Sequence, residues 1–524
     1  MPKVLIADAL SPTAVEIFAR RGVGAVVATG LAPDALAARI ADFDGLAVRS
    51  ATKVTAELLA VAPRLRVVGR AGIGVDNIDV AAATARGVVV MNTPFGNSVT
   101  TAEHAIALMF ALARQLPAAD RSTRAGKWEK SRFLGAELAF KQLGLIGCGN
   151  IGAIVANRAQ GLGMRVMVYD PFISEDRARD LGVEKVELAD LLKQADFVSL
   201  HTPLTDQTRG ILSRWALAQC KPGVRIVNCA RGGLIDEDAL AEAIVAGHVA
   251  GAALDVFAVE PARESPLFAL DQVVVTPHLG AATVEAQENV ALQVAEQMAD
   301  YLTTGAVVNA LNMPSVSAEE APRLRPYMKL AEQLGSFAGQ LTETGLMGVT
   351  VSYSGHVAEL NTRPLTAAIL QGLLSPLMDS VNMVNAPLMA RERDIDVRTI
   401  TQERVDGYTT LIRLAVLTER GERTVSGTLF NDQPRVVEVR GVPIEAQLGT
   451  HMLFLRNEDK PGFIGALGSL LGDAGLNIAT FHLGRDAAGG NALALIEVDQ
   501  AVPEAVLDAI CALPQVVQAK ALGF

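Results

Sequence analysis

The first hundred residues alternate short apolar runs with stretches whose apolar positions recur at helical spacing. The apolar runs have strand length and lie at 4–7, 46–48, 67–68 and 88–91. Strands that alternate with helices indicate βαβ units and a parallel sheet. Residues 101–116 then form one long predicted helix, with Thr100 or Thr101 as its N-cap.

A second alternating block predicts another parallel sheet. Its strands are expected at 143–146, 166–169, 197–200, 225–228, 251–254 and 273–276. A charged stretch at 121–140 separates the blocks and predicts an exposed crossover, and residues 285–303 predict a helix without Gly or Pro. Residues 315–326 are polar and predict a linker.

The pattern changes after this linker. Residues 327–450 mix helical and strand segments without a recognisable chemical motif. From 452 onward the order is strand, turn, helix, strand, turn, strand, helix and strand, which predicts a βαββαβ unit. The predicted fold class is therefore α/β with two doubly wound, Rossmann-like parallel sheets, followed by an α+β segment and a ferredoxin-like unit.

Composition narrows the functional classes. A chain of 524 residues with 50% hydrophobic residues has room for three or four domains. Its net charge of −11 disfavours a nucleic-acid partner. The four cysteines are scattered without a CxxC pair, so we expect no disulfide framework and no metal site, and a cytoplasmic location. No apolar stretch reaches 18 residues, so we expect no membrane segment.

A glycine motif after the first strand of the second block predicts a dinucleotide site. Gly147, Gly149 and Gly152 match G-x-G-x-x-G between a strand and a helix. Such glycines allow a tight turn, approach of a pyrophosphate to backbone N–H groups, and close helix packing. Asp170 ends the next strand, where a carboxylate binds ribose hydroxyls and repels a 2′-phosphate, so we expect NAD. The alternative is a glycine-rich turn that only allows packing.

Three polar residues follow later strands of the same predicted sheet: Arg231, Glu260 and His278. Ligands of open α/β sheets bind beyond the carboxyl ends of the strands. Removing a hydride from an alcohol needs a base, and a His beside a carboxylate fits that role, while a guanidinium can bind a substrate carboxylate. Taken singly, each residue can equally be a turn residue, a helix-end donor or a solvated charge.

These segments together resemble the D-isomer-specific 2-hydroxyacid dehydrogenases. The resemblance covers 1–315 and includes His201-Thr202-Pro203, Asn228-Cys229-Ala230-Arg231-Gly232-Gly233 and Thr276-Pro277-His278-Leu279-Gly280. It implies that Arg231 binds and polarises the substrate, that Glu260 orients and tunes His278, and that His278 is the acid/base. It also implies an NAD site lined by Gly147, Gly149, Asn150, Ile151, Gly152, Asp170, Thr202, Cys229, Ala230, Arg231, Asp255, His278 and Gly280.

The same resemblance implies a domain division and a substrate. A substrate-binding domain would comprise 1–98 and 286–315, an NAD-binding domain 99–285, an intervening domain 316–450 and an ACT domain 451–524. The long form of the family acts on a phosphorylated hydroxy acid, D-3-phosphoglycerate, in serine biosynthesis. Basic loops fit such a substrate, and its candidate binding residues are Arg49, Ser50, Arg70, Gly72 and, from a partner in a dimeric or tetrameric homo-oligomer, Arg132. The alternative for Arg49 and Arg70 is a surface ion pair.

The C-terminal unit resembles ACT domains, which sense amino acids. By this resemblance Asn457, Asp459 and Asn477 match effector-contacting positions, with L-serine as the effector. The alternative is that Asp459 caps a helix and the unit serves only in assembly. Two rival functions for the whole chain remain open: a hydroxypyruvate or 2-oxoglutarate reductase, and a non-catalytic NAD-sensing regulator like the C-terminal-binding co-repressors.

Overall fold

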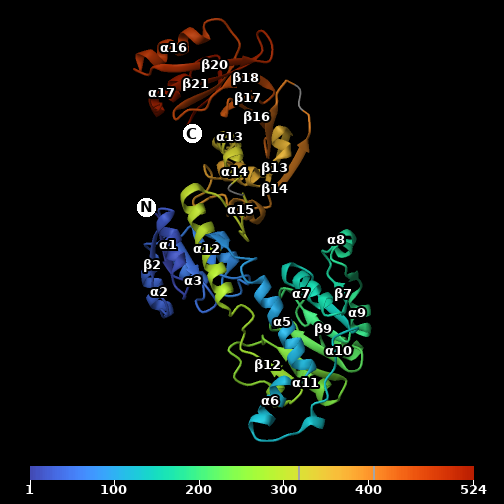
Figure 1. The fold of residues 1–524 in the computed structure, drawn as a ribbon. Coiled ribbons are helices and arrows are strands. Elements are labelled where there is room, and N and C mark those ends of the chain that lie inside the picture. Colours follow the sequence, from blue (N-terminus) through green and yellow to red (C-terminus); the bar gives the residue numbers. More distant parts are fainter. Residues whose placement is uncertain (317–318, 405–406) are drawn as a thin grey trace.

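The computed structural model describes residues 1–316, 319–404 and 407–524, which form four sheets (Figure 1). None of the helices in these residues is long and apolar enough to cross a membrane. The predicted fold class is confirmed: two parallel, doubly wound sheets precede a mixed sheet and an antiparallel ferredoxin-like sheet.

The first sheet is parallel throughout, in the order β2-β1-β3-β4-β5. Its strands are β1 (Lys3–Ile6), β2 (Gly24–Val27), β3 (Gly45–Val48), β4 (Val67–Arg70) and β5 (Val89–Met91). Its helices are α1 (Thr13–Arg20), α2 (Pro33–Ile40), α3 (Ala56–Ala60) and α4 (Val80–Ala85). Strand β2 was not predicted; it lies at the edge of the sheet, and two of its four residues are exposed.

A much later helix, α12 (Val284–Thr304), completes this lobe (Figure 1). Its residues Val294 and Met298 belong to the same apolar core as Val4 and Val67. Gly69 on β4 allows this approach, because a Cβ there would lie 2.2 Å from the Met298 sulfur. The end of the chain's second block therefore covers the sheet of the first.

The second sheet is also parallel, in the order β12-β11-β10-β9-β6-β7-β8. Its strands are β6 (Gln142–Ile146), β7 (Arg165–Tyr169), β8 (Glu184–Lys185), β9 (Phe197–Leu200), β10 (Val224–Asn228), β11 (Val249–Leu254) and β12 (Val273–Val275). Its helices are α5 (Ser98–Ala113), α7 (Asn150–Gly161), α8 (Glu175–Asp180), α9 (Leu188–Gln194), α10 (Arg214–Gln219), α11 (Glu237–Val245) and η2 (Pro266–Ala269). The chain order reverses between β6 and β9, where open sheets of this type bind ligands.

The long helix begins earlier than predicted. Helix α5 starts at Ser98 after Asn97, so Thr100 and Thr101 lie inside its first turn and neither is the N-cap. The hydroxyl of Thr101 instead donates to the carbonyls of Asn97 and Gly280, because a Thr inside a helix can satisfy its hydroxyl on a preceding carbonyl. The predicted crossover contains α6 (Leu116–Arg124) and η1 (Lys130–Arg132), and Trp128 in it is 87% exposed.

The predicted linker is wrong in its second half. Helix α13 (Ala321–Gln340) begins there and contains Pro326. Leu324 and Leu330 are buried, whereas Arg323, Arg325 and Lys329 beside them are exposed, so the polar composition of 315–326 concealed the start of an amphipathic helix.

Helix α13 covers a mixed sheet in the order β14-β13-β15-β16-β17-β18. Its strands are β13 (Leu346–Gly355), β14 (Asp396–Gln402), β15 (Thr410–Thr418), β16 (Gly421–Phe430), β17 (Gln433–Val439) and β18 (Val442–Ala446), with η3 (His356–Glu359), α14 (Arg363–Leu374) and α15 (Ala386–Glu392). The last sheet has the order β20-β21-β19-β22 and contains β19 (Met452–Glu458), α16 (Phe463–Asp473), β20 (Ile478–Arg485), β21 (Asn491–Val498), α17 (Glu504–Cys511) and β22 (Val516–Leu522). The two sheets share an apolar core, in which the rings of Phe337 and Phe454 lie 5.8 Å apart.

Candidate active site

The glycine turn lies between β6 and α7, as the motif predicted. Gly147 has φ of 96°, and a Cβ there would lie 2.5 Å from the carbonyl oxygen of His201. A Cβ on Gly152 would lie 2.3 Å from the Gly147 oxygen. A Cβ on Gly149 would meet no atom within 4 Å, so its missing side chain leaves open space directly before the first turn of α7. This is the cradle that a pyrophosphate requires at a helix N-terminus.

Asp170 lies beside this turn. Its Oδ2 accepts a hydrogen bond from the N–H of Cys148 at 2.7 Å, and its Oδ1 accepts one from the N–H of Phe172 at 2.8 Å. The acidic side chain at the end of β7 is therefore fixed next to the glycine turn, as ribose recognition requires. The donors and the open cradle fit an NAD molecule.

The remaining predicted cofactor positions cluster at the carboxyl edge of the same sheet. Asn150 and Ile151 open α7, Thr202 follows β9, Cys229 and Ala230 follow β10, and Asp255 and Gly280 lie beyond β11 and β12. His201, between them, is partly exposed as a residue, but desolvation of its imidazole lowers the pKa of that group to about 4. The neutral imidazole of His201 has its Nε2 2.8 Å from the Ser199 hydroxyl.

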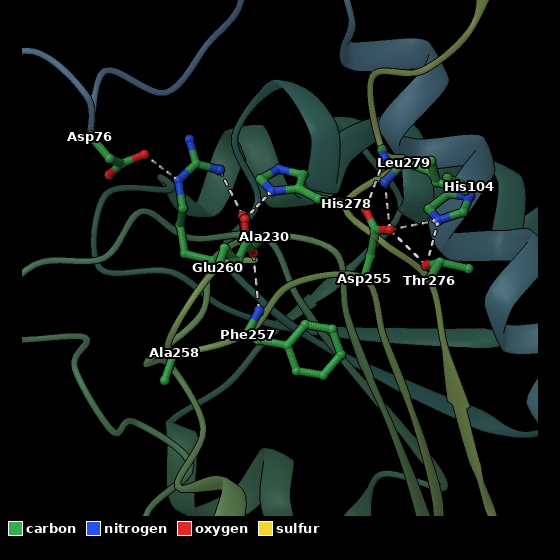
Figure 2. A network of polar contacts seen from close by, with 12 residues as sticks. Asp76, His104, Ala230, Asp255, Phe257, Ala258, Glu260, Thr276, His278 and Leu279 are labelled. Atoms are coloured by element: carbon green, nitrogen blue, oxygen red, sulfur yellow. Dashed lines mark hydrogen bonds and ion pairs between the residues drawn. The ribbon is translucent and has the colours of Figure 1, made fainter. Parts of the chain in front are cut away.

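His278 and Glu260 form a close pair at this edge (Figure 2). Nδ1 of His278 donates to Oε2 of Glu260 at 2.7 Å, and Oε1 of Glu260 accepts from the N–H of Phe257 at 3.1 Å. The hydrogen bond to Glu260 raises the pKa of His278 above its ordinary value and outweighs burial. Burial opposes ionisation of Glu260, but the hydrogen bonds from His278 and Phe257 outweigh it and lower its pKa. With Nδ1 held by Glu260, Nε2 is the ring nitrogen left for a substrate.

Asp255 holds the loop that carries His278 (Figure 2). The side chain of Asp255 is fully buried and accepts from the N–H groups of Leu279 at 2.7 Å and Gly280 at 2.8 Å. The Thr276 hydroxyl donates to it at 2.6 Å, and Nε2 of His104 lies 3.2 Å from the same carboxylate. Burial opposes ionisation, but these hydrogen bonds outweigh it and lower the pKa of Asp255. Both carboxylate oxygens of Asp255 thus accept hydrogen bonds from groups of the protein itself.

Arg231 lies near His278, close enough that its charge lowers the pKa of that imidazole. Its Nε donates to Oδ2 of Asp76 at 2.9 Å, and its Nη1 donates to the Ala230 carbonyl at 2.6 Å. Asp76 comes from the loop after β4 of the first sheet, so this ion pair joins the two lobes.

Two further guanidinium groups of the first lobe belong to the same neighbourhood. Burial, together with the charges of Arg231 and Arg49, lowers the pKa of Arg70 to about 10. Nε of Arg70 is buried without a hydrogen-bond partner among the described residues. Gly72 has φ of 143°, and a Cβ there would lie 1.4 Å from Nη1 of Arg70. The exposed Ser50 follows Arg49, whose backbone N–H donates to Asp8.

Arg132 is not brought to this cluster within one chain. Its guanidinium pairs with Glu129 and Asp271, each at 3.2 Å. Asp271 lies just before β12, whereas His278 follows that strand, so Arg132 lies at the opposite edge of the sheet.

The three predicted effector residues do not form one site within one chain, because Asn457 and Asp459 lie at one end of the sheet and Asn477 at the other. In the antiparallel register with β21, Asn457 lies opposite Ala492, whereas Ile478, next to Asn477, lies opposite Val498. Six residues of strand separate these positions by roughly 20 Å. Asp459 accepts from Arg485 at 2.9 Å, and Nδ2 of Asn477 donates to Asp499 at 2.8 Å.

Sequence patterns assigned no role to four residues that the structure places in the site: Asp8, Asp76, His104 and Thr276. Asp8 accepts from Arg49 and Thr52 and so fixes the loop that carries Arg49. The one available signal was its position at the carboxyl end of β1. His104 lies within a helix, where no local pattern shows that it faces Asp255.

Comparison with known protein families agrees with this architecture. Residues 106–280 match "D-isomer specific 2-hydroxyacid dehydrogenase, NAD binding domain", 323–440 match "D-3-phosphoglycerate dehydrogenase intervening domain" and 451–515 match "ACT domain". The crystal structure of the TT0316 protein from Thermus thermophilus is similar with a TM-score of 0.55 and 36% identity, over 59% of this chain and 99% of that one.

Fold and site thus define an NAD-binding protein of the 2-hydroxyacid dehydrogenase class. D-3-phosphoglycerate dehydrogenase of Synechocystis sp. is 42% identical over 97% of this chain and 92% of its own length. The enzyme of the same name from Methanocaldococcus jannaschii is 42% identical over 98% of both chains. The chain belongs to the D-3-phosphoglycerate dehydrogenase family.

Proposed function

We propose that this chain oxidises D-3-phosphoglycerate to 3-phosphohydroxypyruvate with NAD, the first step of L-serine biosynthesis. The observation that carries the proposal is one cluster that contains both the His278–Glu260 pair and three guanidinium groups. An acid/base serves the reacting hydroxyl, and Arg231, Arg70 and Arg49 supply positive charge for a substrate that carries both a carboxylate and a phosphate.

Each residue of the site has its own role in the proposed reaction. Nε2 of His278 accepts the proton of the C2 hydroxyl, and Glu260 stabilises the imidazolium that results. The guanidinium of Arg231 binds the carboxylate and polarises the developing carbonyl, while Arg49, Ser50, Arg70 and the Gly72 backbone receive the rest of the substrate. Bound NAD supplies the nicotinamide that accepts the hydride from C2. Closure of the two lobes on the substrate excludes water from the reaction.

The domain division, the effector and the assembly belong to the same proposal. The substrate-binding domain is 1–98 with 286–315, and the packing of α12 on the first sheet supports it. L-serine binds through Asn457, Asp459 and Asn477, and because a free amino acid is far shorter than roughly 20 Å, it reaches both ends of the unit only where two copies meet. Arg132 likewise acts on the substrate pocket of a partner chain in a homo-oligomer.

The test is NADH formation with purified protein, measured with D-3-phosphoglycerate and with unphosphorylated D-glycerate, each with and without L-serine. We expect strong preference for the phosphorylated substrate and loss of activity in His278→Ala. Equal turnover of both substrates would favour a hydroxypyruvate or 2-oxoglutarate reductase instead. Binding of NAD without turnover of any hydroxy acid would favour the regulator.

A further inference from the structure

Asp76 has no part in the chemistry proposed above, yet its carboxylate lies directly on Arg231. The two residues are 155 positions apart in the chain, and the contact joins the loop after β4 to the loop after β10 (Figure 2). The Oδ2–Nε distance is 2.9 Å although the Asp76 side chain is 68% exposed. An exposed ion pair adds little stability, so the value of this contact lies in where it holds the guanidinium.

Two hydrogen bonds fix the plane of this guanidinium. Nε is bound by Asp76 and one N–H of Nη1 by the Ala230 carbonyl. Within the described part of the chain, Nη2 has no hydrogen-bond partner. Because a guanidinium binds a carboxylate through two neighbouring N–H groups, the edge formed by Nη2 and the second N–H of Nη1 remains for the substrate.

Gly74 provides the space for this arrangement. A Cβ on Gly74 would lie 1.6 Å from Nη2 of Arg231 and 2.9 Å from Oδ2 of Asp76. Gly74 is not among the glycines with positive φ, so its backbone does not require glycine. What it supplies is the absence of a side chain at the point where Arg231 reaches across from the other lobe.

We propose that Asp76 is a positioning residue for the dehydrogenase reaction, which holds Arg231 by Nε so that its Nη edge faces the substrate carboxylate, with Gly74 as the seat for that side chain. This inference rests on the proposed role of Arg231. It predicts that the hydrogen bond of Asp76, rather than its negative charge, is what the reaction needs.

The test compares Asp76→Ala with Asp76→Asn, which keeps an acceptor oxygen but removes the charge. The matched control is Asp300→Ala, which breaks an ion pair of 2.7 Å with Arg21 on the outside of the same lobe. We expect Asp76→Ala to lower kcat/KM for the hydroxy acid about tenfold to a hundredfold, with KM for NAD and Tm unchanged. Asp76→Asn stays within about threefold of the wild type, because a neutral acceptor still orients the guanidinium. The control retains wild-type kinetics.

Three outcomes would overturn the proposal. Wild-type kinetics in Asp76→Ala would mean that Arg231 needs no such support. Equal losses in both Asp76 variants would assign the effect to charge. A lower KM for the substrate in both would identify Asp76 as a competitor for Arg231.

Gly74→Ala tests the seat independently of charge. We expect the kinetic signature of Asp76→Ala, and the matched control is Gly465→Ala, where a Cβ meets nothing within 4 Å. Unchanged kinetics in Gly74→Ala would refute the seat. If the wild type turns over another 2-hydroxy acid rather than D-3-phosphoglycerate, the proposed substrate is wrong, and the same variants are compared on that acid because Arg231 serves the carboxylate.

Discussion

Nδ1 of His278 lies 2.7 Å from Oε2 of Glu260, and it does so from a backbone with φ of 56°. A non-glycine residue in this region is uncommon and needs support from its surroundings. The support is visible: the N–H of His278 donates to the Asp255 carbonyl at 2.9 Å, and the next two N–H groups donate to the Asp255 carboxylate. Asp255 therefore holds the backbone of His278 in this conformation, and Glu260 orients the imidazole.

Replacing Glu260 by Gln should shift the pH dependence of catalysis. Glu260 raises the pKa of His278, and oxidation needs the neutral imidazole, so the acid limb of kcat/KM lies at higher pH in the wild type than an unperturbed histidine would give. Without the carboxylate the pKa falls, and the limb moves to lower pH. Reduction of the 2-oxo acid needs the imidazolium, so its rate at neutral pH falls by about tenfold or more. The measurement is the rate in both directions across about pH 5–9. In the control Glu242→Gln the acid limb of kcat/KM should stay in place. An acid limb that also stays in place in Glu260→Gln would contradict the prediction.

Asp255→Ala should destabilise the NAD-binding lobe as well as slow the reaction. The change leaves the buried N–H of Gly280 without its acceptor and frees the loop of His278. An unpaired buried group costs about 1–3 kcal/mol, so the transition of this lobe in urea moves to lower concentration. Urea unfolding followed beside kcat measures both effects. A variant with wild-type stability would show that solvent replaces Asp255 at no cost.

Asp170→Ser should relax the choice of coenzyme. The carboxylate beside the glycine turn repels a 2′-phosphate, and like charges at such a site cost several kcal/mol. We expect the ratio of kcat/KM for NADP to that for NAD to rise about a hundredfold. Asp176→Ser, an exposed change on α8, is the control. An unchanged ratio of the two kcat/KM values would mean that the coenzyme ribose does not lie beside Asp170.

Arg132→Ala should raise KM for the phosphorylated substrate about tenfold, since a charge-assisted hydrogen bond to phosphate contributes about 1.5–3 kcal/mol. kcat should change little, because Arg132 does not touch the reacting carbon. Arg124→Ala, which removes an exposed pair with Asp120 on the neighbouring helix, serves as control. Steady-state kinetics, measured at a protein concentration high enough to maintain the proposed homo-oligomer, test this expectation. An unaltered KM would mean that Arg132 does not contact the substrate.

Local pattern was sufficient for those parts of the site that lie where strands end. The carboxyl ends of parallel strands meet at one edge, so Gly147, Asp170, Arg231 and His278 could be assigned to one site without coordinates. Local pattern failed at two short edge strands, β2 and the two-residue β8, and where polar residues surround the first turn of a helix, as in α13.

The sequence by itself determined the dinucleotide turn and most strands of the two parallel sheets, because each depends on residues adjacent in the chain. Only the tertiary structure decided that Asp76 meets Arg231 and that His104 and Thr276 meet Asp255. These contacts join segments far apart in the chain, and side-chain packing between such segments leaves no periodic signal along it. The same reason separates Asn457 from Asn477: strand register, which neighbours in sequence do not specify, puts them at opposite ends of one sheet.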